Sequence, residues 1–275
     1  PPSLGAASLR GGFALAALLL LLPLGAPLAA EPVPKASDAA PAELDGLDGP
    51  AIARRAEDVM RSDRTYLEAT MTVRSPRLGK PRVVSFRSWD DRAEDRSFIR
   101  ILSPAKDAGT GFLRLPPNLW TYVPRVERTM RIPPSMMLQS WMGSDFTNDD
   151  LVKDSSNLDD YDHALLGIDP APEGYDGRRA YVLQYTPHED APVVWGRIVA
   201  WVDEAKGTPL RQEFYDEAGE RLRLMRFSDI REIDGRHFAH LWSMVPLDKQ
   251  GHETTIRIEE VKFDPQIEET IFTKR

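Results

Sequence analysis

The sequence contains no cysteine among its 275 residues. This absence excludes a disulfide-stapled fold, a thiol nucleophile and a thiolate metal site, and it removes the residue through which a covalent lipid anchor would be attached. A hydrophobic core must therefore stabilise the chain, and 41% apolar residues supply ample material for one.

Histidine and net positive charge are also scarce. There are five histidines, and 43 acidic residues outnumber 35 lysines and arginines to leave a net charge of −8. An acidic balance argues against an electrostatic interface for nucleic acid. His237 and His240 lie three positions apart on a predicted strand, so they point to opposite faces and cannot chelate one ion. We expect no nucleic-acid partner, no metal and no cofactor.

Motifs of the common enzyme classes are missing as well. The sequence has no nucleophile elbow and no zinc-protease signature. Gly109-Thr110-Gly111 precedes a strand-like run rather than a lysine and a helix, so it predicts a turn instead of a phosphate site. The acid pairs Asp90-Asp91 and Asp149-Asp150 are more typical of capping or solvation than of a glycosidase. We expect no catalytic residues and no enzyme, and a carbohydrate-active hydrolase is the third hypothesis.

One short apolar run stands near the N-terminus. Residues 13–22 are apolar and follow Arg10, and the small residues 25–30 precede Glu31. This is the order of a secretory signal, and the run has about half of the roughly 20 residues that a membrane-spanning helix needs. We expect residues 1–30 to be a signal peptide and the mature protein to be periplasmic, which suits a chain without thiols.

The folded domain is expected over residues 51–275. Residues 31–50 are rich in proline, alanine and aspartate without periodicity, which is typical of a flexible leader. Asp48 and Pro50 form a helix start. A helix of about 12 residues is predicted from the apolar stripe that follows, which comprises Ile52, Ala56, Val59 and Met60.

After this helix the hydrophobic period changes to two, which indicates strands. About 11 to 12 strands with short gaps and no alternating helices predict a mainly β fold, one antiparallel sheet curled into an open barrel. In the last strand the apolar parity changes between Ile258 and Val261, which predicts a bulge at Glu259-Glu260. The expected strands cover residues 67–73, 83–89, 96–103, 110–115, 118–123, 127–132, 178–186, 195–203, 208–215, 220–229, 236–247 and 253–263.

Residues 133–166 interrupt this pattern. Thr147 to Asp150 has the form of a capping box, and the preceding apolar residues recur at helical spacing after Pro133-Pro134. We therefore expect two short helices, of which the first is a lid over the barrel, followed by a polar loop at 154–161. The apolar face of the predicted lid comprises Met137, Leu138, Trp141 and Met142.

Large apolar residues crowd the central third of the chain, and we predict that they line a ligand cavity. Core packing is the alternative explanation for each of them. Methionine is typical of adaptable apolar binding surfaces, and a sheet covered by one helix leaves part of its inner face free. The predicted cavity and lid residues are Trp89, Phe98, Phe112, Trp120, Tyr122, Met130, Met137, Leu138, Trp141, Met142 and Phe146.

The segment 103–151 carries a family resemblance. It reads SPAKDAGTGFLRLPPNLWTYVPRVERTMRIPPSMMLQSWMGSDFTNDDL. The stretches GTGFLR, LWTYVP and SWMGSDF make it resemble the outer-membrane lipoprotein-sorting protein family of LolA-like periplasmic carriers. The resemblance implies a half-open antiparallel β-barrel closed by helices, an N-terminal helix and an apolar cavity for acyl chains. It also implies an RND-type inner-membrane lipid exporter and an outer-membrane acceptor as possible partners.

Two functions follow from these expectations. The first is a periplasmic carrier that binds a lipid or lipoprotein acyl chain for transfer between the inner and outer membranes. The second is an envelope sensor or scaffold of the same fold that regulates a partner protein and carries no cargo. Three arginines surround an apolar strand on this acidic protein and are predicted to contact a partner: Arg125, Arg128 and Arg131.

Overall fold

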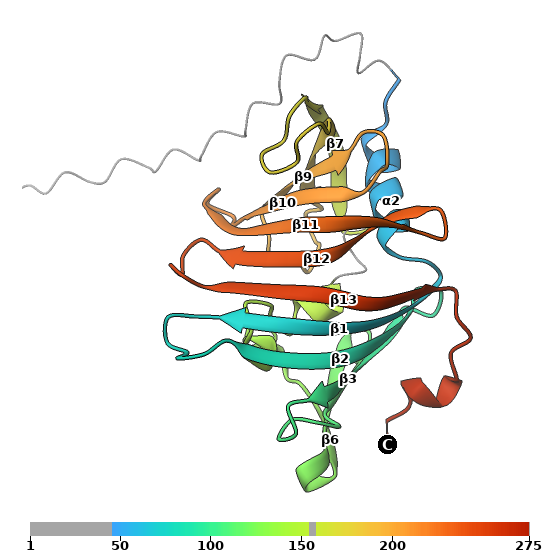
Figure 1. Ribbon diagram of the computed structural model, residues 1–275, viewed down its shortest axis with the longest axis vertical. Coiled ribbons are helices and arrows are strands. Elements are labelled where there is room, and N and C mark those ends of the chain that lie inside the picture. Colours follow the sequence, from blue (N-terminus) through green and yellow to red (C-terminus); the bar gives the residue numbers. More distant parts are fainter. Residues whose placement is uncertain (1–45, 154–157, 275) are drawn as a thin grey trace, which may run out of the picture. The chain divides into compact units, whose positions relative to one another are not determined.

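The computed structural model describes residues 46–153 and 158–274. Within them, thirteen strands form one antiparallel sheet in the order β6-β5-β4-β3-β2-β1-β13-β12-β11-β10-β9-β8-β7 (Figure 1). Two meanders, β1 to β6 and β7 to β13, are thus joined through the antiparallel pair β1 and β13. The sheet is open, because its edge strands β6 and β7 do not pair with each other. The fold is an open antiparallel β-barrel, as expected.

The strands of the first meander are short toward the edge. They are β1 (Arg64–Arg74), β2 (Arg82–Asp91), β3 (Arg96–Ser103), β4 (Gly111–Leu115), β5 (Asn118–Val123) and β6 (Arg128–Arg131). Those of the second are β7 (Tyr161–Asp169), β8 (Ala180–Pro187), β9 (Arg197–Asp203), β10 (Pro209–Tyr215), β11 (Arg221–Ile233), β12 (Arg236–Pro246) and β13 (Glu253–Phe263). A short 3-10 helix, η4 (Glu269–Phe272), follows the last strand.

The N-terminal helix is confirmed as α2 (Gly49–Met60), with Pro50 in its first turn. The helix contacts β7, β8, β9 and β12, and its buried face forms a core cluster with residues of β7, β8, β9 and β10. The helix begins at Gly49, so the expected leader over 31–50 is two residues too long. The predicted signal peptide, and residues 31–45 of the leader, lie outside the described residues.

One strand was not expected. β7 begins inside the stretch 133–166, which the sequence pattern assigned to helices and loop, and extends beyond it to Asp169, so there are thirteen strands instead of 11 or 12. Its register against β8 shifts between Leu165 and Gly167, which breaks the alternation that identifies a strand. The other strands are confirmed, as is the bulge: Glu68 pairs with Glu260 and Ala69 with Ile258, which leaves Glu259 as the extra residue.

The predicted lid helix is wrong in its geometry. The segment contains two 3-10 turns, η2 (Pro134–Met136) and η3 (Trp141–Gly143), and a bridge between Ser140 and Thr147 closes a loop around η3. Trp141 is only 2% exposed whereas Leu138 is 63% exposed, so the expected apolar face does not exist. The backbone N–H of Trp141 donates to the carbonyl of Phe146 at 2.7 Å, a loop contact that replaces helical hydrogen bonding.

The second short helix is confirmed as α3 (Asp150–Lys153). Its capping box is reciprocal. The Thr147 backbone N–H and hydroxyl donate to Asp150 Oδ2 at 2.6 and 2.9 Å, and the Asp150 N–H donates to the Thr147 hydroxyl at 3.2 Å. In the described part of the chain, no helix is long and apolar enough to cross a membrane.

Candidate functional site: a cavity inside the open barrel

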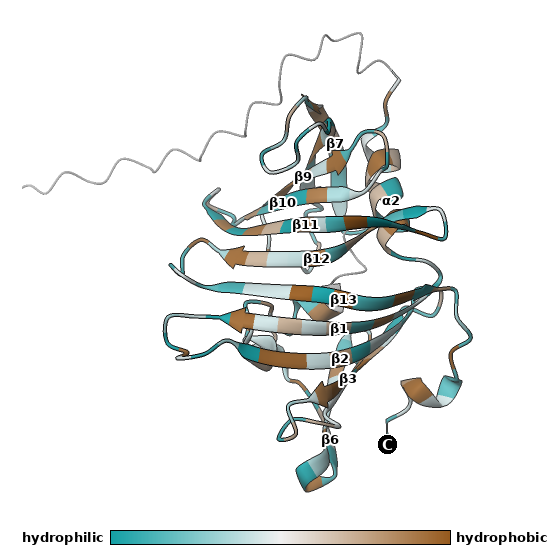
Figure 2. Cartoon of the chain, viewed as in Figure 1, coloured by the Kyte–Doolittle hydropathy of each residue, from teal (hydrophilic) through white to brown (hydrophobic). Residues whose placement is uncertain are grey.

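A cavity of about 230 Å³ lies on the inner face of the sheet, and both meanders contribute to its wall. Alternation along each strand decides which residues reach it. On β1 and β3 these are Leu67 and Ile99, and on β13 they are Ile256 and Ile258. Figure 2 shows hydrophobic and hydrophilic residues following one another along the strands. The remaining apolar wall is formed by Phe86, Phe214, Met225, Trp242 and Met244.

Segments outside the sheet cover this cavity. Trp141, Phe146 and Leu151 reach it from the segment that replaces the predicted lid helix, and Val193 to Trp195 reach it from the β8–β9 connection. Arg223 on β11 connects the two covers: its Nη1 lies 3.0 Å from Asp150 Oδ2, and its guanidinium stacks 4.8 Å from the centre of the Trp195 ring.

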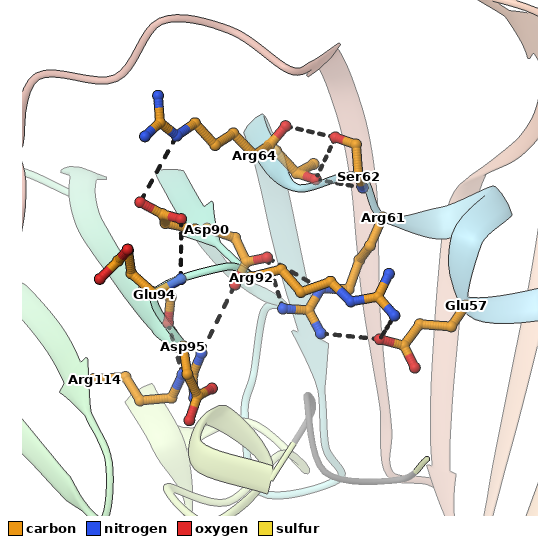
Figure 3. A network of polar contacts seen from close by, with 12 residues as sticks. Glu57, Arg61, Ser62, Arg64, Asp90, Arg92, Glu94, Asp95 and Arg114 are labelled. Carbon is orange, nitrogen blue, oxygen red and sulfur yellow. Dashed lines mark hydrogen bonds and ion pairs between the residues drawn. The ribbon is translucent and has the colours of Figure 1, made fainter. Parts of the chain in front are cut away.

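One end of the cavity is polar. Arg61, at the end of α2, pairs with Asp90 through Nη2 to Oδ2 at 2.7 Å, and Arg114 pairs with Asp95 through Nη1 to Oδ1 at 2.6 Å (Figure 3). Arg114 also donates from Nε to the Ser97 hydroxyl at 3.3 Å. Because its side chain is only 4% exposed, these partners offset the cost of burying its charge. This end can offer hydrogen bonds to a polar group on a ligand.

Tyr161 contributes a further polar atom to the wall. Burial, with smaller contributions from Asp160 and Asp149, raises the pKa of its hydroxyl above the ordinary value. The side chain therefore remains neutral at physiological pH and can donate a hydrogen bond. Among the residues that the structure describes, no group of three histidine or acidic side chains could hold a metal ion.

Two of the predicted cavity residues, Trp141 and Phe146, line the cavity. Phe112 and Met142 belong to the core beside it, where the Phe112 and Trp141 rings meet edge to face with centroids 5.7 Å apart. The Phe112 ring and the Met142 thioether therefore pack behind the wall and do not line the cavity themselves.

Four other predicted residues, including Trp89, lie on the opposite face of the sheet. Trp89 stacks on Phe98 with ring centroids 5.8 Å apart, and its register partner on β1 is the outward-facing Tyr66. Phe98, Trp120 and Tyr122 line a separate outer hollow of about 530 Å³ that the C-terminal residues 270–274 help to enclose. The prediction that these four line the inner cavity is wrong, because both parities of β2 to β5 are apolar and the sequence does not show which faces inward.

The remaining predicted residues are near the β5–β6 hairpin. Met130 and Leu138 are exposed, and Met137 is half-buried; none of the three lines the cavity. Arg125, Arg128 and Arg131 are all exposed on or beside this hairpin, so they are accessible to a partner. Their proposed contact stays a prediction.

Sequence reasoning missed most of the cavity wall. Leu67 and Ile99 could have been found from period-two alternation once the inward parity was known. Trp195 and Trp242 are isolated tryptophans in predicted strands that contain no recognisable sequence motif, so nothing in the sequence marked them as cavity residues. The polar residues Arg61, Asp90 and Arg114 gave no signal, since they come together only in the folded sheet.

Comparisons with known proteins agree with this architecture. A family model described as "-like: Uncharacterized protein" matches residues 93–275. A DUF1329 family protein from Desulfovibrio piger is 26% identical, with a TM-score of 0.73 over 82% of this chain and 95% of that one. No curated protein matches the chain.

Two further crystal structures share the fold. A putative outer membrane lipoprotein-sorting protein domain from Vibrio parahaemolyticus is 22% identical, with a TM-score of 0.69 over 82% of this chain and 95% of that one. A LolA superfamily protein from Nitrosomonas europaea is 21% identical, with a TM-score of 0.68 over 83% of this chain and 99% of that one.

Proposed function

The chain belongs to the family whose model, described as "-like: Uncharacterized protein", matches residues 93–275, and from this membership and its LolA superfamily fold we propose that it is a periplasmic carrier. Its cargo is a lipid or a lipoprotein acyl chain, held in the inner cavity and released without chemical change. The observation that supports this proposal most directly is the apolar cavity itself, whose wall combines residues from both meanders with a polar end.

The cavity volume limits what the structure can hold as it stands. At about 30 Å³ for each water- or methylene-sized unit, 230 Å³ accommodates about eight methylene groups. Burying them provides roughly 6 kcal/mol of gross transfer free energy at about 0.8 kcal/mol each, before the costs of binding. A chain of 14 to 16 carbons, of the order found in membrane lipids, therefore extends beyond this volume, either out of the open mouth of the cavity or into space that a covering segment such as residues 141–151 vacates.

The polar end determines the orientation of the cargo in this proposal. An acyl chain packs against Leu67, Ile99 and Ile256, and its headgroup or ester lies near Arg61 and Arg114. Since both arginines already pair with carboxylates, a neutral hydrogen-bonding headgroup fits there without leaving a charge unpaired.

The compartment and the partners belong to the same proposal. A carrier between two membranes receives its cargo at an inner-membrane exporter, here of the RND type, and delivers it to an outer-membrane acceptor. The exposed arginines of the β5–β6 hairpin suit an acidic loop of such a membrane protein. Reversing the charge of Arg125 and Arg128 should weaken that contact in a salt-dependent manner, and binding that stays unchanged would discard it.

The carrier proposal is tested by filling the cavity. Ile99→Trp places a large side chain on the inner wall, and we expect it to reduce binding of a fluorescent C16 fatty acid at least about tenfold, because the chain loses the space it needs. The same variant purified from the periplasm should retain less extractable lipid than the wild type.

The matched control is Arg100→Trp, which adds the same side chain at the neighbouring, exposed position on the outer face of β3. It should bind the fatty acid as the wild type does. Equal binding by wild type and both variants, together with no extractable lipid in the wild type, would refute the carrier and favour the scaffold that carries no cargo.

A further inference from the structure

Three side chains from distant parts of the sequence form a chain of polar contacts at one end of the barrel. Ser75 Oγ lies 3.0 Å from His252 Nε2, and His252 Nδ1 lies 3.4 Å from Asp145 Oδ1. Serine thus contacts one ring nitrogen and the carboxylate contacts the other, which is the arrangement that defines a Ser-His-Asp triad regardless of the fold.

The loops that carry these residues hold them in place. Ser75 follows β1, His252 precedes β13, and the pairing of Val73 with Thr254 places both strand ends side by side (Figure 1). A Cβ on Gly251, whose φ is +75°, would lie 2.9 Å from Pro76 Cγ, so the two hairpin turns are in contact.

Asp145 is the buried member of the group. Its side chain is nearly inaccessible, and Thr254 Oγ1 donates to its Oδ2 at 2.7 Å while accepting from the Asp145 backbone N–H at 3.0 Å. Oδ1 therefore stays directed at His252. Ser75 and His252 are half-buried, so both side chains remain partly accessible to solvent.

We propose that Ser75, His252 and Asp145 form a hydrolytic site for carboxylic esters, distinct from the cavity. Ser75 Oγ attacks the ester carbonyl carbon while His252 Nε2 takes the hydroxyl proton, and Asp145 stabilises the resulting imidazolium. The C–O bond to the alcohol then breaks, and His252 returns the proton to the departing oxygen. A water then gives a proton to His252 Nε2 and attacks the acyl carbon, and His252 returns that proton to Ser75 Oγ as the acyl C–O bond breaks, which releases the carboxylic acid and regenerates Ser75.

The backbone around Ser75 supplies a donor for the oxyanion. The Arg77 backbone N–H lies 3.3 Å from Ser75 Oγ and donates to it in the resting structure. When the hydroxyl forms the acyl bond, this N–H can turn to the carbonyl oxygen that becomes negative. The sequence-based expectation of no enzyme relied on local motifs, whereas this group spans 177 residues from Ser75 to His252.

The test uses the full-length mature protein, a fluorophosphonate probe and p-nitrophenyl acetate. We expect the probe to add to Ser75, as located by peptide mass spectrometry, and we expect Ser75→Ala to abolish both labelling and ester hydrolysis. His252→Gln should lower the hydrolysis rate by about a hundredfold or more. Because both substituted residues are partly exposed, their variants should remain folded, which far-UV circular dichroism checks.

Ser85→Ala is the matched control, since the Ser85 hydroxyl lies 2.6 Å from the Ser103 hydroxyl, a partner that does not act as a general base. It should be labelled and should turn over ester as the wild type does. Labelling that persists in Ser75→Ala, or wild-type hydrolysis no faster than that of Ser75→Ala, overturns the proposal. Neither result depends on lipid retention, so this site and the carrier can fail separately.

Discussion

At the scale of single residues, Trp141 connects the core to the cavity. Its ring meets Phe86 and Phe112 edge to face, with centroids 5.7 Å away in both cases, and one side of it lines the cavity. Trp141→Ala should therefore cost about 3–5 kcal/mol of unfolding free energy and enlarge the cavity. Urea unfolding and fatty-acid binding measure the two effects.

Leu224→Ala is the comparison for Trp141→Ala, since Leu224 is buried on β11 but does not line the cavity. We expect it to lose stability without a change in the preferred chain length of the fatty acid. If Trp141→Ala lost binding but no stability, Trp141 would behave as a lid residue instead of as core.

A second residue-scale prediction concerns the buried Glu213, which is 1% exposed. Burial alone would raise the pKa of its carboxyl, but the Tyr215 hydroxyl at 2.7 Å and the Arg211 and Arg221 guanidinium groups together lower it below the usual value. A lowered pKa means that this carboxylate stabilises the fold above about pH 4.5, and that the stabilisation is lost as the pH falls through the folded-state pKa.

We expect Glu213→Gln to lower the unfolding free energy by about 2 kcal/mol or more at pH 7, because Arg211 and Arg221 both lose a contact with a buried carboxylate. The difference from the wild type should shrink as the pH falls from 5 to 3. Urea unfolding at several pH values measures this, and a difference that stays constant over that range would show that the Glu213 charge does not contribute.

At the scale of elements, the start of α2 is fitted closely to β7. A Cβ on Gly49 would lie 2.5 Å from the backbone oxygen of His163. Alanine normally favours helix, yet Gly49→Ala should cost about 1–3 kcal/mol because the helix must move away from the strand. Thermal unfolding measures the loss, and Gly79→Ala, where a Cβ meets nothing within 4 Å, is the control that should change little.

At the scale of the whole molecule, the C-terminal segment covers the aromatic outer face of the first meander. Arg96 Nη1 pairs with Glu269 Oε2 at 2.8 Å and its guanidinium stacks on Phe272, while the Lys274 ammonium lies 3.7 Å from the centre of the Trp120 ring. Truncation after Asp264 should expose Phe98, Trp120 and Tyr122, raise the binding of a hydrophobic dye and lower the melting temperature.

Phe272→Ala serves as the milder form of this truncation, because Phe272 is the buried residue of η4. It should give a smaller change of the same sign in dye binding and melting temperature. Dye binding that is unchanged in the truncated protein would mean that the outer aromatic face is not covered by this segment in solution.

The sequence by itself determined the features that depend on neighbours along the chain. The helix at Ile52 to Met60, twelve of the strands, the bulge at Glu259 and the capping box of Thr147 and Asp150 all follow from local periodicity and local hydrogen bonding. The number of strands and their short connections already predicted the open barrel, and the family resemblance in 103–151 implied the same fold. These features could be predicted because the residues that produce them lie within a few positions of one another.

Only the tertiary structure decided which side of each strand faces inward and which distant residues meet. Trp89 on β2 and Phe98 on β3 are apolar strand residues, as the residues of a cavity wall are, yet both face outward, where they stack on each other. An outer face that is partly covered also requires apolar residues, so apolar character alone does not identify the inner face. The joining of Arg61 to Asp90, and of Ser75 to His252 and Asp145, depends on the pairing of strands far apart in the sequence. Such contacts leave no periodic signal in the sequence. A hydrogen bond constrains the positions of two side chains, but it does not constrain which residues lie between them in the sequence.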